Sequence, residues 1–247
     1  MTDAASGSFP TERETPDIET ASDGYARRFA GPVGNFFLEM QGKTVVRLLT
    51  DLPRGATILD VGGGHAQLTP WLVDAGFEVV VLGSTRACGV RLSKWTDSGA
   101  CHSHVGDLVH LPYADRAFDA AVSFRQLPHF VRWANLVSEL CRVAPRVVVD
   151  FPSWRSVNVL SEALFSTKKR IEGNTRPFGL FHRAEMAAEF RKHQFCVTRT
   201  VPQFFFPMVL HRAARSATLT RLVETLPRWT GLTHWLGSPV IIRADAI

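Results

Sequence analysis

Two kinds of hydrophobic spacing alternate along this chain of 247 residues. Short, nearly continuous apolar runs, such as 147–149 (VVV), are typical of strands buried on both faces of a sheet. Between them apolar residues recur at helical spacing, as at Leu68, Leu72 and Ala75. This alternation predicts an α/β protein with a mostly parallel sheet. The predicted strands are 57–61, 78–83, 102–106, 118–124, 146–151, 195–205 and 239–243, and the later predicted helices are 133–144, 157–171, 184–193 and 209–229.

The first 52 residues divide into two parts. Residues 1–22 are rich in Ser, Thr, Asp, Glu and Pro, and this composition predicts disorder. Residues 23–52 have helical spacing that is interrupted near Gly31-Pro32. The amino terminus lacks the basic and apolar stretches of a signal peptide, and no later run reaches the roughly 18 apolar residues that span a bilayer. We therefore expect a cytoplasmic protein.

The segment 57–85 has the pattern strand, glycine turn, helix, strand. Gly62, Gly63 and Gly64 let the backbone turn sharply and approach a ligand at the positive end of a helix. A dinucleotide site has the spacing G-x-G-x-x-G, and here Gln67 stands at the third glycine position. The turn predicts an adenosine-bearing cofactor, and by itself it leaves a nicotinamide dinucleotide open.

Two later motifs narrow this choice. Asp60-x-Gly62-x-Gly64 is followed by Val105-Gly106-Asp107 and then by 111–122 (LPYADRAFDAAV). In this order and spacing the three motifs resemble the type 11 class I S-adenosylmethionine (SAM) methyltransferases, which include quinone, lipid and small-molecule enzymes. The resemblance implies SAM as the cofactor and methyl transfer as the reaction.

The same resemblance implies a Rossmann-like class I methyltransferase fold. Its seven-stranded, mostly parallel sheet has helices on both faces, and strand seven runs antiparallel beside strand six. Residues 23–247 would form one domain after the disordered tail. That domain would comprise a helical lid (23–52), a SAM-binding core (55–153) and substrate-side helices with an insertion (154–238).

The cofactor residues are also assigned by resemblance. Asp60 would organise the methionine end of SAM, and Asp107 would accept a hydrogen bond from the adenine amino group. One position departs from the family, because Gly83 replaces the acid that accepts both ribose hydroxyls. The hydroxyl of Ser84 or Thr85 would replace it in part. The implied cofactor-binding residues are Asp60, Gly62, Gly63, Gly64, Ser84, Asp107 and Leu108.

The missing acid leaves two alternatives open. An NAD-type oxidoreductase requires the same acid, so Gly83 counts against that class as well. A SAM-binding protein without catalytic activity is the second alternative.

After the fourth strand, His129 is the candidate base, with an ordinary pKa of about 6.5, unless it is a buried structural histidine. Arg125 would hold an anionic acceptor group or pair with an acid of the lid.

Basic residues are concentrated towards the carboxyl terminus. Residues 151–230 contain 13 Lys and Arg against 5 Asp and Glu, although the net charge of the chain is only +5. With the apolar run 204–210, this predicts a small, anionic, amphiphilic acceptor and peripheral membrane contact, unless the basic surface is merely solvated. No nucleic-acid motif and no metal-ligand spacing is present, so we expect neither partner. Candidate acceptor-binding residues, besides Arg125, are Arg176, His182, His211 and Arg212.

Overall fold

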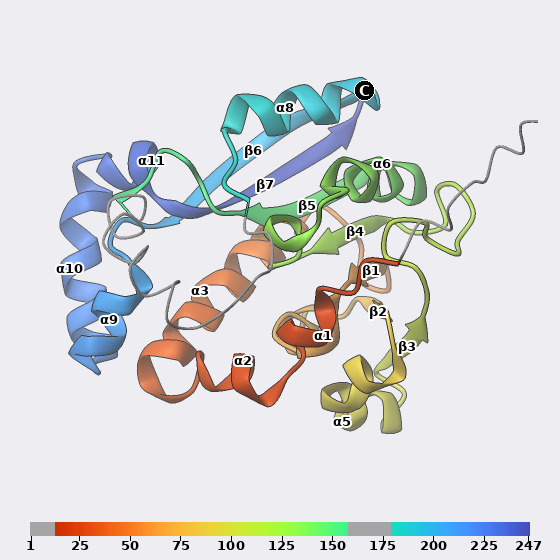
Figure 1. Cartoon of the computed structure of the whole chain (residues 1–247), viewed down its shortest axis with the longest axis horizontal. Helices are drawn as coiled ribbons and strands as arrows, with labels where there is room; N and C mark the ends of the chain where they lie inside the picture. Colours follow the sequence, from red (N-terminus) through yellow and green to blue (C-terminus); the bar gives the residue numbers. More distant parts are fainter. Residues whose placement is uncertain (1–12, 158–178) are drawn as a thin grey trace, which may run out of the picture.

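A seven-stranded sheet crosses the molecule, in a computed structural model that describes residues 13–157 and 179–247 (Figure 1). The strand order is β3-β2-β1-β4-β5-β7-β6. Strands β1 to β5 pair in parallel, whereas β7 is antiparallel to both β5 and β6. This sheet, including its antiparallel seventh strand, is the one that the sequence predicts. The strands are β1 (Thr57–Val61), β2 (Glu78–Gly83), β3 (Cys101–Val105), β4 (Ala120–Ser123), β5 (Arg146–Phe151), β6 (Phe195–Phe204) and β7 (Ser238–Ala246).

Helices cover both faces of this sheet (Figure 1). One face packs against α3, α4 and α5, and the other against α6 and α8. The helices α9, α10 and α11 lie between β6 and β7, where the sequence predicts a helical insertion. The bounds are α1 (Asp17–Thr20), α2 (Asp23–Arg27), α3 (Gly31–Leu48), α4 (Thr69–Asp74), α5 (Ser93–Asp97), α6 (Trp133–Val143), α8 (Arg183–Lys192), α9 (Met208–Ala214), α10 (Ala217–Trp229) and α11 (Leu232–Leu236), with short 3-10 turns η1 (Gly63–His65), η2 (Arg86–Leu92) and η3 (Leu127–His129).

Successive residues of β1 enter two different cores. Ile58 packs on the side of α3 and α4, whereas Leu59 and Val61 pack on the side of α6 and α8. All three side chains are fully buried. Burial of an aliphatic side chain of this size contributes about 1.5–3 kcal/mol. Packing on both faces therefore fixes the register of β1 and the position of the turn that follows it.

The amino-terminal segment differs from the expectation of a disordered tail over 1–22. From residue 13 onward the chain lies on the molecule, and Asp17 and Thr20 of α1 are buried. Composition predicts disorder here because the segment has few apolar residues. Polar contacts with residues more than sixty positions away hold it instead, for example from Asp17 to Ser84.

The insertion also differs from the single helix expected over 209–229. The backbone of Arg215 has the left-handed conformation, with φ of +52°, and this ends α9. Ser216 then caps a new helix by accepting a hydrogen bond from the Leu219 N–H.

The helix expected over 157–171 lies outside the described residues. Within the described part of the chain, no helix combines the length and the apolar content needed to cross a membrane. All four cysteines are free.

Candidate active site

The carboxyl ends of the parallel strands meet at one edge, where open α/β sheets bind ligands. There β1 leads directly into η1 through Gly62, whose φ of +76° is a conformation that favours glycine. A Cβ on Gly63 would lie 2.1 Å from Asp60 Oδ2, and one on Gly64 would lie 2.1 Å from the Cys88 carbonyl oxygen. Each of the three turn positions therefore excludes a larger residue, by backbone conformation or by contact.

Asp60 is the most unusual residue of this edge. Its side chain is fully buried, and within the described part of the chain neither carboxylate oxygen has a hydrogen-bond partner. Burial raises its pKa to about 7, against the opposing field of Arg125. A buried carboxylate without donors is costly, so the position suits a ligand that brings donors of its own.

Other buried hydrogen-bond acceptors around the turn also lack a donor among the described residues. Several buried side-chain oxygens gather here without a hydrogen-bond partner from any described residue, although such atoms are rare in native proteins. The turn is therefore chemically suited to a ligand with several donors, and SAM offers an ammonium group, two ribose hydroxyls and an adenine amino group. The atoms are Asp17 Oδ1, Asp60 Oδ1 and Oδ2, Gln67 Oε1, Thr69 Oγ1 and Gln126 Oε1.

A carboxylate does stand at the end of β2, but it comes from α1. Asp17 Oδ2 lies 3.6 Å from the position that a Cβ on Gly83 would take. It accepts a hydrogen bond of 2.7 Å from the Ser84 backbone N–H, while the Ser84 hydroxyl lies 3.9 Å from the Cys88 thiol. Sequence reasoning missed Asp17, because its only signal was an acid in a segment expected to be disordered.

On the adenine side of the predicted site, Asp107 and Leu108 follow β3. Asp107 is half-buried, and its Oδ1 accepts a hydrogen bond of 2.9 Å from the Val109 N–H. Leu108 is fully buried and belongs to the core on the α6 side. The structure therefore brings both residues to the carboxyl edge, with Asp107 as the one that reaches the surface.

Arg125 joins the lid to the sheet. Its backbone N–H donates to Asp150 Oδ1 at 2.6 Å, and its guanidinium donates to Gln41 of α3 and lies 4.3 Å from the centre of the Phe29 ring. Gln41 in turn donates to Asp150 Oδ2 at 3.0 Å. Burial raises the pKa of Asp150 to about 6, and Arg125 opposes that shift. The structure thus shows Arg125 bound to the lid through the amide of Gln41, whereas the sequence suggests an acid of the lid as its partner.

His129 ends η3, directly after β4, and is half-buried. Its backbone N–H donates to the Gln126 carbonyl oxygen at 2.9 Å. The Gln126 side chain donates to the Gly62 carbonyl oxygen at 3.1 Å. His129 therefore stands one turn away from a side chain that contacts the glycine turn.

The predicted acceptor residues have separate neighbours. His211 is buried and pairs with Glu224 at 2.9 Å, and Glu224 also accepts from the backbone N–H groups of Phe205 and Phe206. This pair fastens α9 to α10, so His211 does not present its ring to a ligand. Arg212 is exposed on the same helix.

His182 lies elsewhere, at the start of α8. Its ring stacks on Trp154, with centroids 5.9 Å apart, beside a cavity of about 340 Å³ that Arg155, Arg183 and Trp235 also line. Arg176 lies outside the described residues. The structure therefore does not gather the described members of this predicted set into one anion pocket.

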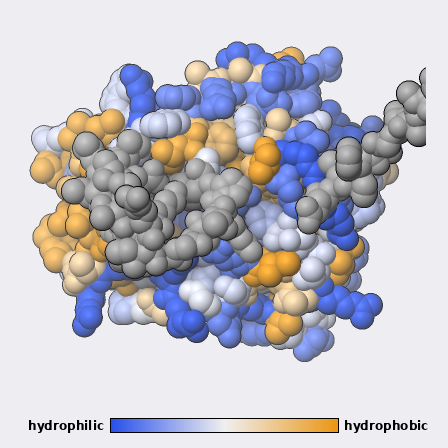
Figure 2. All heavy atoms as spheres, in the orientation of Figure 1, coloured by the Kyte–Doolittle hydropathy of each residue, from blue (hydrophilic) through white to orange (hydrophobic). Residues whose placement is uncertain are grey.

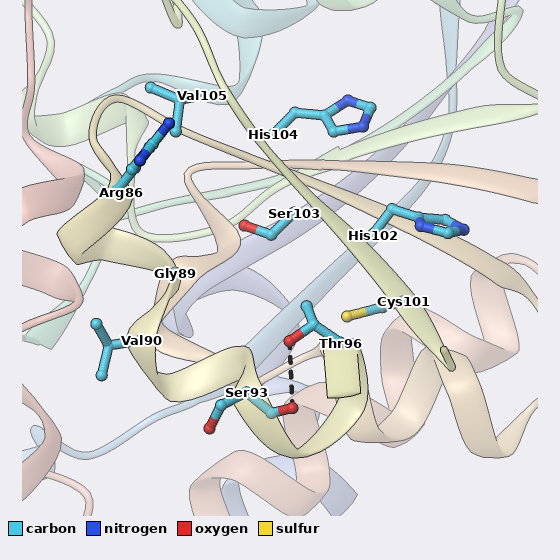
Figure 3. A pocket seen from close by; sticks show the side chains of 10 residues that line it. All are labelled: Arg86, Gly89, Val90, Ser93, Thr96, Cys101, His102, Ser103, His104 and Val105. Atoms are coloured by element: carbon cyan, nitrogen blue, oxygen red, sulfur yellow. Dashed lines mark hydrogen bonds between the residues drawn. The ribbon is translucent and has the colours of Figure 1, made fainter. Parts of the chain in front are cut away.

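Two larger hollows differ in their relation to the turn. A groove of about 750 Å³ follows the edge strand β3, with Arg86 and Val105 near one another and Thr96 beside Cys101 farther along it (Figure 3). It includes none of the predicted site residues. A cavity of about 490 Å³ lies between the lid helices and the residues after the turn, and its lining includes His65. Burial, reinforced by Arg125, lowers the pKa of His65 to about 3, so its ring is neutral.

Comparisons with known proteins agree with this geometry. Residues 59–146 match a family model described as a methyltransferase domain. A search of curated protein sequences gives no significant match. The fold is similar to that of magnesium protoporphyrin IX methyltransferase from Synechocystis PCC 6803, which was solved with bound S-adenosylhomocysteine (SAH). The two chains are 16% identical, and the TM-score is 0.62 over 92% of this chain and 96% of that one.

Two further structures are similar. Geranyl diphosphate C-methyltransferase from Streptomyces coelicolor A3(2) gives 15% identity and a TM-score of 0.60 over 85% of this chain and 76% of that one. The cyclase SpnF gives 17% identity and a TM-score of 0.58 over 83% and 79%. At these identities the structures establish the fold, and the family match adds the domain type. Residues 59–146 therefore match a methyltransferase domain, as the motifs predict, and the whole described chain has the fold of the class I methyltransferases.

Proposed function

We propose that the protein transfers a methyl group from SAM to a small, hydrophobic or lipid-like acceptor that carries an anionic group. The observation that carries the proposal is an exposed apolar face on α9, α10 and α11, at the left of the molecule (Figure 2). Trp229 and Leu222 are 84% and 69% exposed. Single exposed apolar residues are common on protein surfaces, whereas a contiguous apolar face of this kind is typical of contact with an apolar partner. Its other members are Val209, Leu210, Leu219, Val223, Leu226, Leu232 and Trp235.

The apolar face adjoins the lid. Phe204, at the end of β6, packs edge-on against Phe37 of α3 with ring centroids 4.3 Å apart. The same small core includes Met208 of α9 and Ala217 of α10. The exposed apolar face therefore borders the buried core beneath the lid. A membrane-associated acceptor would bring this face of the protein into peripheral contact with the lipid.

Basic groups beside this face support the anionic part of the proposal. Although Arg212 as a whole residue is exposed, desolvation of its guanidinium lowers its pKa, and the field of Arg28 at the end of α2 lowers it further. Two guanidinium groups, one from the lid and one from α9, therefore lie within electrostatic range of each other. An anion between them would relieve their repulsion. One similar structure is named for geranyl diphosphate, an acceptor of this chemical kind.

The cofactor residues follow from the turn. We assign the methionine end of SAM to Asp60 and to the turn Gly62, Gly63 and Gly64, and the adenosine end to Ser84, Asp107 and Leu108. Bound SAM supplies an electrophilic methyl group on its sulfonium. The chain's own contribution is to position the acceptor, exclude water and accept a proton. We assign that proton to His129, and the acceptor's charge to Arg212, with His182 and the undescribed Arg176 as further candidates.

The test begins with an acceptor screen. Cell extract is incubated with the protein and SAM labelled in its methyl group, and labelled products are identified by mass spectrometry. With the acceptor in hand, Arg212→Ala should lower kcat/KM about tenfold or more and His129→Gln should lower kcat, and both should leave the affinity for S-adenosylhomocysteine (SAH) unchanged. Arg215→Ala, an exposed arginine on the same segment, is the matched control and should change neither. A neutral polar product or a methylated nucleic acid would contradict the proposal.

A further inference from the structure

Residues 14–23, which we call the amino-terminal strap, cross the carboxyl edge of the sheet. At one end, the Glu14 carboxylate accepts from the Val131 N–H at 2.6 Å and from Arg132 Nε at 2.8 Å, both in the loop after β4. At the other end, Arg91 in η2 donates to a strap carbonyl oxygen at 2.9 Å. Because β1 lies between β2 and β4, the strap passes over the glycine turn.

The middle of the strap carries Asp17. Its side chain is fully buried, although it belongs to a segment of only one helical turn. Oδ2 accepts from the Ser84 N–H at the end of β2, and Oδ1 has no hydrogen-bond partner among the residues described. Farther along, Thr20 accepts from Gln126 Nε2 at 3.0 Å, and Gln126 also contacts Gly62. The strap thus places a carboxylate with one unused oxygen beside the turn.

We propose that Asp17 supplies the carboxylate that accepts the ribose hydroxyls of SAM, in the place of an acid on β2. The inference rests on SAM binding at the glycine turn. An ionised carboxylate has acceptor positions for two hydroxyls and binds them more strongly than a neutral group does. With Oδ2 already oriented by Ser84, Oδ1 is fixed in direction, and little side-chain entropy is lost when the diol binds.

Gly83 and Asp17 are complementary. A Cβ on Gly83 would lie 3.1 Å from the Cβ of Cys88, a tight contact, and 3.6 Å from Asp17 Oδ2. A carboxylate at position 83 would therefore compete with Asp17 for one volume and place two like charges together. The absence of a side chain at Gly83 leaves that volume to the strap. The departure from the family at this position thus has a structural counterpart in the same chain.

The experiment measures SAH binding to the full-length chain by calorimetry. Asp17→Ala should weaken SAH binding at least tenfold, about 1.4 kcal/mol. An SAH analogue without the 2′ and 3′ hydroxyls should bind the wild type and Asp17→Ala equally, because it lacks the groups that Asp17 accepts. Asp17→Asn keeps an oxygen for the Ser84 N–H, so the strap stays in place, yet it should also weaken SAH binding. Gly83→Asp added to Asp17→Ala should restore part of the lost affinity.

Asp23→Ala is the matched control, because Asp23 is an exposed strap acid that pairs with Arg91. It should leave SAH binding unchanged. An equal loss for SAH and for the analogue would show that Asp17 only holds the strap, and would overturn the inference. Tighter binding by Asp17→Ala would also overturn it, since the strap would then compete with the cofactor. A wild type that binds neither SAM nor SAH would instead contradict the methyltransferase function itself.

Discussion

Three buried carboxylates at the carboxyl edge of the sheet differ in what surrounds them. Asp150 is hydrogen-bonded by Gln41 and by the Arg125 backbone. Asp17 has one donor, from Ser84, and Asp60 has none among the described residues. The fewer donors the protein provides, the more the carboxylate suits binding to a ligand rather than structural support. Asp60 and Asp17 are therefore the two carboxylates that we assign to SAM, the first to its methionine end and the second, from its position beside Gly83, to its ribose.

The Asp60 carboxylate should make the stability of the cofactor-free protein depend on pH. Burial raises its folded pKa to about 7 from the ordinary 3.8. Since the folded chain then holds a proton that the unfolded chain has released, stability falls as pH rises from about 4 to about 7 and stays lower above that. Asp60→Asn should therefore raise the free energy of unfolding at pH 8, by about 1–4 kcal/mol, with a much smaller effect at pH 4.

Chemical denaturation at both pH values measures this change, and SAH calorimetry on the same variant should show lost binding. Asp74→Asn, an exposed acid on α4, is the control and should change neither quantity. Equal destabilisation by Asp60→Asn at pH 4 and pH 8 would show that the carboxylate is structural.

At the scale of elements, α6 holds the loop between β3 and β4. Arg142 donates to the carbonyl oxygens of Leu111 and Tyr113 and to the carboxylates of Asp115 and Glu139. Glu139 also accepts from the Leu111 N–H at 2.6 Å. The polar part of the motif at 111–122 thus fastens a loop whose first residues follow Asp107. These contacts give the polar residues of the motif a structural role.

Loss of this fastening should reduce stability. Arg142→Lys keeps the charge but loses the planar fork of donors, so several of these acceptors lose their partner. We expect a loss of about 2 kcal/mol in the free energy of unfolding, the size of one to two hydrogen bonds to a charged group, and therefore a Tm lower by roughly 4–8 °C. Calorimetric unfolding measures it. Arg47→Ala, an exposed arginine of α3, should stay within about 0.5 kcal/mol of the wild type, and an Arg142→Lys protein as stable as this control would refute the assignment.

At the scale of the whole molecule, the lid, the strap and the insertion all meet the carboxyl half of the sheet (Figure 1). The strap reaches the loops after β2 and β4, and α3 contacts Asp150 at the end of β5 through Gln41. A ligand at the glycine turn would therefore lie between the sheet and the strap from the amino-terminal end of the described chain. Its binding should stabilise the protein as one unit.

This arrangement leads to a thermal test that separates SAM from a nicotinamide cofactor. SAH at a hundred times its Kd should stabilise the native state by about 2.7 kcal/mol, which corresponds to a Tm higher by roughly 5–10 °C for a chain of this size. NAD at the same concentration should leave the Tm unchanged. A shift with NAD alone would favour the oxidoreductase alternative and contradict the assigned cofactor.

The sequence by itself determined the strands and the glycine turn. Continuous apolar runs such as 147–149 can be satisfied only by burial on both faces of a sheet, and the turn at Gly62 requires a residue that tolerates positive φ. Both are local requirements, written in neighbouring residues. Strands and helices also alternate along the chain, and this order identified the fold, because parallel strands need crossover connections, which are usually helices.

Only the tertiary structure decided which polar side chains meet. The Asp17 carboxylate reaches Ser84 because the strap crosses β1, and His211 is occupied by Glu224 because α9 folds back on α10. Arg125 is likewise held by Gln41, 84 positions earlier in the chain. Hydrogen bonds of this kind leave no periodic pattern in the sequence, since each depends on the relative position of two elements rather than on the spacing within one.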